Sequence, residues 1–203
     1  MKREIIVLAI TGASGALYGL RLCSELLTSG KSVALLVSKA GFHLLREEAG
    51  LELDGDAAQI EAALRALFHV IDDRLTYYGD DDFAAPIASG SSAPTAMVLC
   101  PCTMGTVARL AHGNSNSLIE RCADVMLKEK RPLLLVPRET PLSEIHLENM
   151  LKLARAGARI IPAMPAFYHK PASIDDMVNF VVSKVLDALD IENSLYQRWG
   201  ASH

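Results

Sequence analysis

The sequence predicts an α/β protein whose mostly parallel sheet is covered by helices on both faces. Short apolar strand patterns alternate with helical patterns along the whole chain, as in folds built from successive strand and helix units. The strand segments IIVLAI, AMVLC and LLLVP are almost continuously apolar, which is typical of strands buried on both faces. With 203 residues, half of them apolar, the chain is long enough to form one domain with a substantial core.

The expected elements place the candidate site at one edge of this sheet. Strand patterns occupy 4–10, 32–37, 96–100, 133–137 and 158–161, and helical patterns occupy 15–29, 39–48, 57–68, 104–111, 117–130, 143–156 and 174–189. In open parallel sheets, ligands bind beyond the carboxyl ends of the strands. The residues that follow the strands are therefore the candidates, and they lie at 11–15, 38, 101–106, 137–140 and 162–171.

The first strand runs directly into a glycine-bearing turn at 11–15 and then into a helix. Such a turn lets backbone approach a ligand, and its amides and the positive end of the helix favour a phosphate or an electron-rich ring edge. The glycines at 12, 15 and 19 lack the G-x-G-x-x-G spacing, and the second strand ends in Ser38 and Lys39 instead of the acidic residue of an NAD site. FMN is the better prediction, with a purely structural tight turn as the alternative.

A hydroxyl-rich helix start follows the 96–100 strand, which Pro101 is expected to stop. Its residues, Thr103–Thr106, either cap the helix or hold a second edge of a ligand. Cys100 and Cys102 have no further Cys or His ligands nearby, so we expect no metal. The chain's 4 cysteines form no C-x-x-C pair, and we expect them to be reduced and buried.

Charged and aromatic residues follow the last two strands. Arg138 is suited to hold a phosphate bidentately, and Glu139 is suited to move a proton or to order a cationic intermediate. The proline-stiffened loop 162–171 presents Tyr168 and Lys170, which suit a phosphate held against an apolar pocket. Packing of Phe167 and Tyr168 on the core is the alternative.

Composition excludes several function classes. A net charge of −4 gives no electrostatic footprint for nucleic acid or an anionic membrane. No apolar run approaches the roughly 20 residues that span a bilayer, and the amino terminus lacks a signal-peptide pattern, so we expect a cytoplasmic protein. The acidic runs at 72–73 and 80–82 lack D-D-x-x-D spacing and are expected to form solvated turns. The apolar helix face at 117–130 and the tail residues Leu195, Tyr196 and Trp199 suggest oligomerisation, because a monomer would leave them partly exposed.

Over nearly its whole length the chain resembles the UbiX-type flavin prenyltransferases. The motifs that carry the resemblance are TGASGALYG at 11–19, Ser38-Lys39, ASGS at 88–91, PCTMGT at 101–106, ADVMLKEKRPLLLVPRETPL at 123–142 and PAFYHKP at 165–171. The resemblance implies a Rossmann-like, flavodoxin-related three-layer sandwich. It implies a single flavin-binding domain at 1–203, whose C-terminal helix and tail (about 174–203) contribute to oligomer contacts and site closure. It also implies a dodecamer of trimers.

The resemblance implies a transferase that needs no metal. The enzyme joins the dimethylallyl group of dimethylallyl phosphate to N5 and C6 of reduced FMN. Its product, prenylated FMN, serves a UbiD-type decarboxylase, including those of ubiquinone biosynthesis and aromatic acid decarboxylation.

The resemblance also implies roles for individual residues. Ser14 would lie near the reactive flavin nitrogen, Glu48 and Glu139 would assist proton transfers, and Lys128 and Tyr168 would complete the catalytic set. FMN would be held by Gly12, Ala13, Ser14, Ser38, Thr103, Met104, Gly105, Thr106 and Arg138. Dimethylallyl phosphate would be held by Ser91, Arg121, Lys128 and Tyr168, by Lys184 from a neighbouring subunit, and by Trp199, which would close over the site. The family usually has Arg at position 184, and Lys lacks the fork that grips phosphate bidentately, so weaker substrate binding is expected.

Other functions remain as alternatives. An FMN-dependent decarboxylase of the related cysteine-decarboxylase type shares the fold and the cofactor, but His43, His69 and His112 do not form a recognisable version of its site. A non-catalytic flavin carrier would not require Glu139, Lys128 and Tyr168. A short-chain NAD(P) oxidoreductase would need Tyr-x-x-x-Lys, whereas Lys170 follows Tyr168 by two residues.

Overall fold

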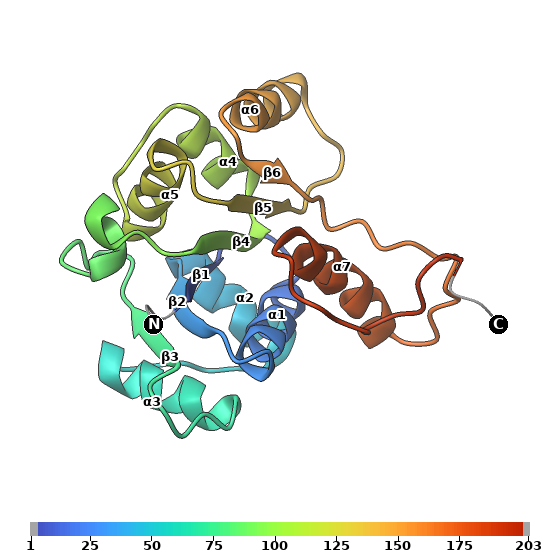
Figure 1. Cartoon of the computed structure of the whole chain (residues 1–203), viewed down its shortest axis with the longest axis horizontal. Coiled ribbons are helices and arrows are strands. Elements are labelled where there is room, and N and C mark those ends of the chain that lie inside the picture. The colour runs from blue at the N-terminus through green and yellow to red at the C-terminus, as the bar shows by residue number, and fades with distance from the viewer. Residues whose placement is uncertain (1–3, 201–203) are drawn as a thin grey trace.

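Six parallel strands in the order β3-β2-β1-β4-β5-β6 form the centre of the molecule (Figure 1). This computed structural model describes residues 4–200. The strands are β1 Ile5–Ile10, β2 Ser32–Val37, β3 Leu75–Tyr78, β4 Ala96–Cys102, β5 Leu133–Pro137 and β6 Arg159–Ile160. The order 3-2-1-4-5-6 is that of a doubly wound Rossmann fold, in which the chain reverses direction between β1 and β4. A ligand is expected at that switch point.

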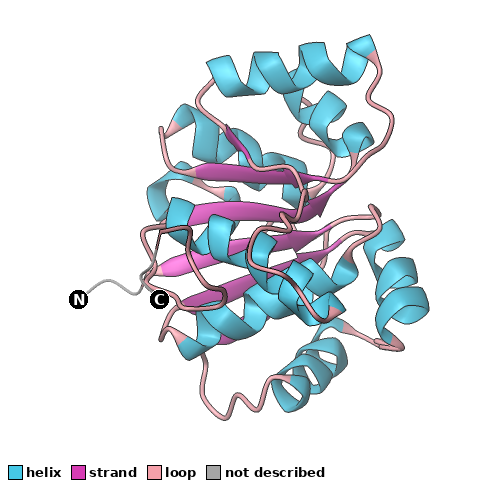
Figure 2. Cartoon of the chain, turned by 90° about the vertical axis from the view of Figure 1, so that its right-hand side faces the viewer, coloured by secondary structure: helices cyan, strands magenta, loops and turns pink. Residues whose placement is uncertain are grey.

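Helices cover both faces of the sheet, as Figure 2 shows. The helices are α1 Ala16–Thr28, α2 Lys39–Ala49, α3 Ala57–Leu67, α4 Met104–Ala111, α5 Leu118–Lys128, α6 Glu144–Arg155 and α7 Ile174–Ala188. Buried side chains of α1, α2, α3 and α7 belong to one core cluster, and those of α4, α5 and α6 belong to the other. The predicted three-layer α/β fold is confirmed.

The strand β1 shows why the apolar runs are continuous. Its side chains at Ile6, Leu8 and Ile10 enter the first core cluster, while Val7 and Ala9 enter the second. Successive side chains of a strand point to opposite faces, so a sheet covered on both faces buries every position. All five residues are at most 4% exposed.

The apolar face of α5 belongs to the protein's own core, contrary to the prediction that a monomer leaves it partly exposed. Leu118, Ile119, Cys122, Val125 and Met126 are each at most 2% exposed. Exposed apolar side chains lie instead on α6, where Ile145, Leu147 and Leu151 are 67%, 53% and 50% exposed. Amphipathic periodicity identified the apolar stripe correctly, but only the packing shows that the sheet covers it.

The segment after β3 is not a linker, although its composition from 77 to 93 resembles one. β3 was missing from the predicted strands, because it is a four-residue edge strand, LTYY, with alternating burial. The following segment packs along α5: Leu118 N donates to Asp80 O at 2.7 Å, and Arg121 Nε donates to Ala88 O at 3.0 Å. Two short 3₁₀ turns, Pro86–Ala88 and Gly90–Ser92, complete the return to β4.

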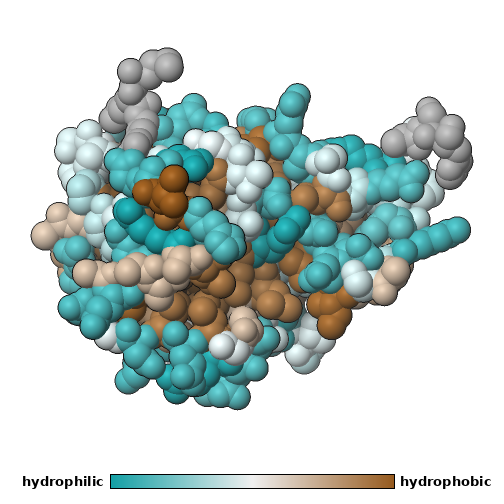
Figure 3. All heavy atoms as spheres, turned by 90° about the horizontal axis from the view of Figure 1, so that it is seen from below, coloured by the Kyte–Doolittle hydropathy of each residue, from teal (hydrophilic) through white to brown (hydrophobic). Residues whose placement is uncertain are grey.

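Pro101 does not stop β4, which continues to Cys102 with a register shift between Leu99 and Cys102. Proline cannot donate to a strand ladder and is therefore tolerated at bulges. The other predicted elements agree with the structure to within one or two residues at each end, apart from the missing β3. Among the described residues, no helix is long and apolar enough to cross a membrane. Figure 3, which views the molecule from the α3 side, shows apolar surface in the middle of that face with hydrophilic side chains around it.

Candidate functional site

Thr11 locks the carboxyl ends of β1 and β4 together at the switch point. Its hydroxyl donates to Pro101 O at 2.9 Å and accepts from Thr103 N at 2.9 Å, while its amide donates to Pro101 O at 3.2 Å. Thr11 is only 2% exposed. These bonds fix the positions of the two loops that carry the predicted flavin contacts.

The glycines of the first turn have structural reasons of their own. A Cβ at Gly12 would lie 2.3 Å from Ala40 Cβ, and a Cβ at Gly19 would lie 2.5 Å from Cys100 O. Gly15 has a φ of 114°, a conformation that other residues rarely adopt. The structural alternative therefore explains the glycine spacing by itself, and the predicted flavin contacts of Gly12, Ala13 and Ser14 rest on where the turn lies.

The anion at the amino terminus of α1 is the carboxylate of Glu48. Its Oε2 accepts from Gly15 N and from Ala16 N, each at 2.8 Å, and the carboxylate also accepts from the Ser14 hydroxyl. A carboxylate stabilises a helix amino terminus by the same amide and dipole interactions that would hold a phosphate. The expectation that these amides receive a ligand anion is therefore wrong for Gly15 and Ala16.

These contacts keep Glu48 ionised. Partial burial on its own would raise the pKa of Glu48, but hydrogen bonds from Ser14, Gly15 and Ala16, together with the charge of Arg138, lower it below its ordinary value. Glu48 is therefore a carboxylate at neutral pH, which makes it a proton acceptor and not a donor.

Arg138 brings the end of β5 to the same place. Its Nε donates to the backbone oxygen of Ser14 at 3.0 Å, a contact between residues 124 positions apart in the sequence. Ser14, Glu48 and Arg138 thus form one group, which we call the switch-point cluster. Glu139 lies next in the chain but accepts locally from Thr140 N at 3.0 Å.

The hydroxyls after β2 and β4 are helix caps. Ser38 Oγ accepts from Gly41 N at 3.0 Å at the start of α2, and Thr103 Oγ1 accepts from Thr106 N at 3.0 Å at the start of α4. The Thr106 hydroxyl is bonded to Thr103 and to Arg109. The capping alternative is confirmed for these groups. Two helix amino termini nevertheless reach the switch-point edge, and the predicted FMN contacts of Ser38 and of residues 103–106 stay a prediction.

Ser91, Arg121 and Lys128 form a second group on α5 and the 3₁₀ turn beside it. α5 leads directly into β5, so its last residue, Lys128, lies at the amino ends of the strands, opposite the switch-point edge. A Cβ at Gly90 would lie 2.7 Å from Lys128 Nζ, which places the turn of Ser91 there as well. Lys128 Nζ contacts Glu129 Oε1 at 2.5 Å. One chain therefore does not bring this group to Ser14.

Tyr168, Lys184 and Trp199 meet in a third group around Tyr196, and we call these four residues the tail cluster. Lys184 Nζ donates to Tyr196 Oη at 2.7 Å, and the Tyr168 and Trp199 ring centroids are 5.3 Å apart. The sequence-based prediction drew Tyr168 together with Ser91, Arg121 and Lys128 and took Lys184 from a neighbouring subunit. The structure instead joins Lys184 to Tyr168 in one chain, because the tail folds back along α7 (Figure 1). The tail was predicted to reach residue 203, and 201–203 lie outside the described residues.

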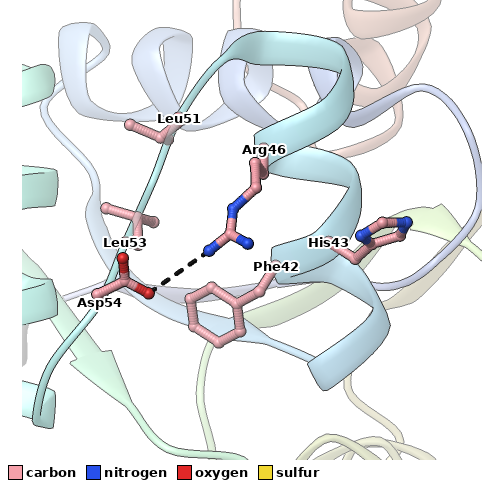
Figure 4. A pocket seen from close by; sticks show the side chains of 6 residues that line it. All are labelled: Phe42, His43, Arg46, Leu51, Leu53 and Asp54. Carbon is pink, nitrogen blue, oxygen red and sulfur yellow. Dashed lines mark ion pairs between the residues drawn. The ribbon is translucent and has the colours of Figure 1, made fainter.

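Beside α2 lies a pocket of about 190 Å³ that contains none of the predicted site residues. Figure 4 shows Phe42 and Leu53 at its apolar wall and the Arg46–Asp54 ion pair, 3.6 Å long, across its opening. His43, named above as a candidate of the alternative decarboxylase site, lies at its edge. This pocket is separate from the switch-point cluster.

The cysteines are free and buried, as predicted. Burial raises the pKa of Cys102 to about 12 and also raises that of Cys100, so neither is a thiolate at neutral pH. The described part of the chain contains no group of three or more His, Cys, Asp or Glu residues that could hold a metal ion.

A doubly wound sheet with helix amino termini, hydroxyls and an arginine at its switch point defines a nucleotide-binding α/β protein. Residues 1–186 match the family model Flavoprotein. Flavin prenyltransferase UbiX of Alkalihalophilus pseudofirmus is 50% identical over 197 residues, which are 97% of this chain and 96% of that protein. UbiX of Pseudomonas aeruginosa is 50% identical over 200 residues, covering 98% and 96%. The chain belongs to the UbiX flavin prenyltransferase family, and the predicted family and transferase class are confirmed.

Solved structures agree with this assignment. The crystal structure of AnUbiX in complex with FMN and dimethylallyl pyrophosphate has a TM-score of 0.88 and 40% identity, with all of both chains covered. A dodecameric FMN-dependent UbiX-like decarboxylase from Escherichia coli has a TM-score of 0.85 and 38% identity, covering 97% of this chain and 100% of that one. A phosphopantothenoylcysteine-type (PPC) decarboxylase is only 18% identical with a TM-score of 0.61, which shows a shared fold and does not favour the alternative decarboxylase function.

Proposed function

We propose that this enzyme transfers the dimethylallyl group of dimethylallyl phosphate to N5 and C6 of reduced FMN and so makes prenylated FMN. Family membership supports the reaction class, and the complex of AnUbiX with FMN and dimethylallyl pyrophosphate supports the two substrates. The observation that carries the proposal is the switch-point cluster, in which an ionised carboxylate is bonded to a serine hydroxyl at the site where this fold binds ligands.

Ser14 and Glu48 form a proton-accepting pair. A hydroxyl has one hydrogen and two lone pairs, and the Ser14 hydrogen is directed to the Glu48 carboxylate. Ser14 Oγ therefore presents its lone pairs to a ligand as an acceptor. Bound reduced FMN supplies the nucleophilic nitrogen and the neighbouring ring carbon. A proton released at that nitrogen passes to Ser14 Oγ and on to Glu48, whose lowered pKa shows that it starts as a carboxylate.

The residues around this pair fit FMN. The amino termini of α2 and α4 both reach the switch-point edge, and their amides can hold a phosphate or a ring carbonyl. Arg138 adds a positive charge there. On this arrangement we assign FMN binding to Gly12, Ala13, Ser14, Ser38, Thr103, Met104, Gly105, Thr106 and Arg138.

The prenyl donor site is shared between copies of the chain. Ser91, Arg121 and Lys128 lie along the face of α5, while Tyr168, Lys184 and Trp199 lie over α7. A single phosphate can meet both groups only when two copies are apposed, and the dodecameric relative from Escherichia coli supports such an assembly. Clustered cations stabilise the charge that develops on a leaving phosphate, and Glu139 assists proton transfer at the same edge.

The product and location follow from this reaction. Prenylated FMN is a cofactor and not an end product, so we propose that it passes to a UbiD-type decarboxylase, such as those of ubiquinone biosynthesis or aromatic acid decarboxylation. We also propose a cytoplasmic location, because the free thiols fit a reducing compartment.

Mass spectrometry of the flavin tests the proposed function. The purified protein is incubated anaerobically with reduced FMN and dimethylallyl phosphate, without metal, and the released flavin is analysed; a parallel reaction contains dimethylallyl pyrophosphate. We expect a gain of one C5H8 unit, and comparison of the two reactions identifies the donor. Unmodified FMN in both reactions, despite tight flavin binding, would instead support the carrier function.

A further inference from the structure

Tyr196 is the centre of the tail cluster, although the predicted site did not include it. Its hydroxyl accepts from Lys184 Nζ at 2.7 Å and is hydrogen-bonded to the hydroxyl of Tyr168. Its ring packs edge-on against Phe180 and Tyr168, with centroid distances of 4.9 and 6.4 Å. The Lys184 ammonium also lies 5.2 Å from the Tyr196 ring centroid, within the range of a cation–π contact.

The fold holds Tyr196 in this position. Arg198 donates from Nη1 and Nη2 to the two oxygens of Asp187 on α7, at 2.9 and 2.6 Å. Asn193 donates to Asp187 Oδ1 at 3.0 Å and accepts from the buried hydroxyl of Ser183 at 2.5 Å. The tail is thereby fastened to α7 on both sides of Tyr196, so the contact with Lys184 is a built feature of the fold.

The hydrogen-bond inventory leaves Tyr196 with one group to offer. A phenol oxygen has two lone pairs and one hydrogen. One lone pair accepts from Lys184. The bond to Tyr168 raises the pKa of Tyr168 and lowers that of Tyr196, which identifies Tyr168 as the donor and Tyr196 as the acceptor. With both lone pairs engaged, the Tyr196 hydrogen is directed to a further acceptor.

We propose that Tyr196 is a substrate-binding residue, which holds Lys184 and Tyr168 together and donates its own hydroxyl hydrogen to a phosphate oxygen of the prenyl donor. This inference rests on the proposed function. It also explains how the chain tolerates Lys at position 184. A lysine ammonium is a point charge without the bidentate fork of arginine, and Tyr196 supplies the second donor at a fixed position beside it.

The test compares Tyr196→Phe with Tyr78→Phe as a matched control, since Tyr78 lies on β3 in the opposite half of the molecule. Both variants keep the ring and lose the hydroxyl. For Tyr196→Phe we expect the KM for dimethylallyl phosphate to rise about tenfold, the loss typical of one hydrogen bond to a charged group, with kcat changed less than twofold. The control keeps the wild-type KM.

A second readout does not depend on turnover. Trp199 is the only tryptophan and its ring contacts Tyr168, so its fluorescence reports on the tail cluster. Titration of the assembled wild-type protein with inorganic phosphate is expected to change this fluorescence, and Tyr196→Phe is expected to need about tenfold more phosphate. If the wild type makes no prenylated flavin but shows this difference, the proposed function fails and the phosphate site at Tyr196 stands.

Lys184→Met removes the same contact from the other side and keeps the test available if Tyr196→Phe does not fold. The two substitutions act on one unit, so the double variant should bind phosphate no more weakly than the worse single variant. An unchanged KM and phosphate response in Tyr196→Phe would overturn the proposal. So would full additivity of the two losses, or a fall in kcat with KM unaltered.

Discussion

The switch-point cluster and the tail cluster are held together by different kinds of contact. Glu48 is bonded to the backbone amides of Gly15 and Ala16, and Arg138 is bonded to a backbone oxygen. In the tail cluster, side chains bind side chains, and Trp199 is 81% exposed. Backbone groups at strand and helix ends move with the core, whereas an exposed tail opens at low cost in free energy. We infer that the first cluster is preorganised for chemistry and that the second closes over a substrate.

The largest expected effect comes from removing the charge of the switch-point cluster. Glu48→Gln keeps the size of the side chain but removes the proton acceptor, so we expect the rate of flavin alkylation to fall at least about 100-fold, as for loss of a general base. Binding of FMN should change little. Single-turnover kinetics with mass spectrometry measures the rate.

Glu47→Gln is the matched control, because Glu47 is the exposed neighbour of Glu48 on α2. It should retain the wild-type rate. Equal rates for Glu48→Gln and Glu47→Gln would show that the cluster has no part in proton transfer.

The second effect tests how tightly α2 is seated against β1. A Cβ at Gly41 would lie 2.5 Å from Ile10 O and 3.0 Å from Val37 Cγ1, so Gly41→Ala must displace the helix that carries Glu48. We expect the free energy of unfolding to fall by about 1–3 kcal/mol. Urea denaturation followed by circular dichroism measures it.

Gly105→Ala provides the comparison for this variant. Its nearest neighbour would be Arg109 Nη1 at 3.4 Å, the end of a flexible side chain, and Gly105 lies in helix α4. Alanine is favoured over glycine inside a helix by roughly 1 kcal/mol, so stability should stay level or rise. A loss equal to that of Gly41→Ala would contradict the close packing of α2.

The third effect concerns the fastening of the tail and depends on pH. The hydrogen bond from Arg198, with one from Asn193, holds the pKa of Asp187 below its usual range. A lowered carboxyl pKa means that the contact contributes stability above the unfolded pKa of about 4 and loses it as pH falls through the lowered folded value. We therefore expect Trp199 fluorescence to change on acidification below about pH 4.

Asp187→Asn should show the altered fluorescence already at neutral pH. Because the Arg198–Asp187 pair is partly exposed, with side chains 48% and 30% accessible, its loss should cost no more than about 1 kcal/mol of global stability. Asp190→Asn, an exposed carboxylate just beyond α7, should behave as wild type. Identical acid transitions in all three proteins would place the titrating group elsewhere.

The smallest expected effect is that of metal removal. The cations of both proposed phosphate groups are protein side chains, so EDTA should leave the rate of prenyl transfer unchanged within twofold. The assay is the same mass spectrometry with and without chelator. A rate that falls with EDTA and returns with Mg²⁺ would show that the side chains do not suffice.

Sequence reasoning succeeded where the signal was local. The alternation of apolar strands and helices predicted the layers, and the residues after each strand predicted which segments reach the site edge. It missed β3, because a four-residue edge strand with alternating burial resembles a loop. It also left the apolar face of α5 for oligomer contacts, since periodicity shows that a helix has an apolar stripe and not what covers it.

For the site, the sequence determined the reaction family and the chemistry available: the motifs, the hydroxyls, the carboxylates and the cations in order along the chain. Only the tertiary structure decided which of them meet. Glu48 occupies the helix terminus that the turn was expected to offer to a ligand. Lys184 joins Tyr168 through Tyr196, while Lys128 lies with the turn at Gly90. The physical reason is that spacing along a strand or helix is set by local geometry, whereas contacts between residues 30 or more apart depend on how whole elements pack.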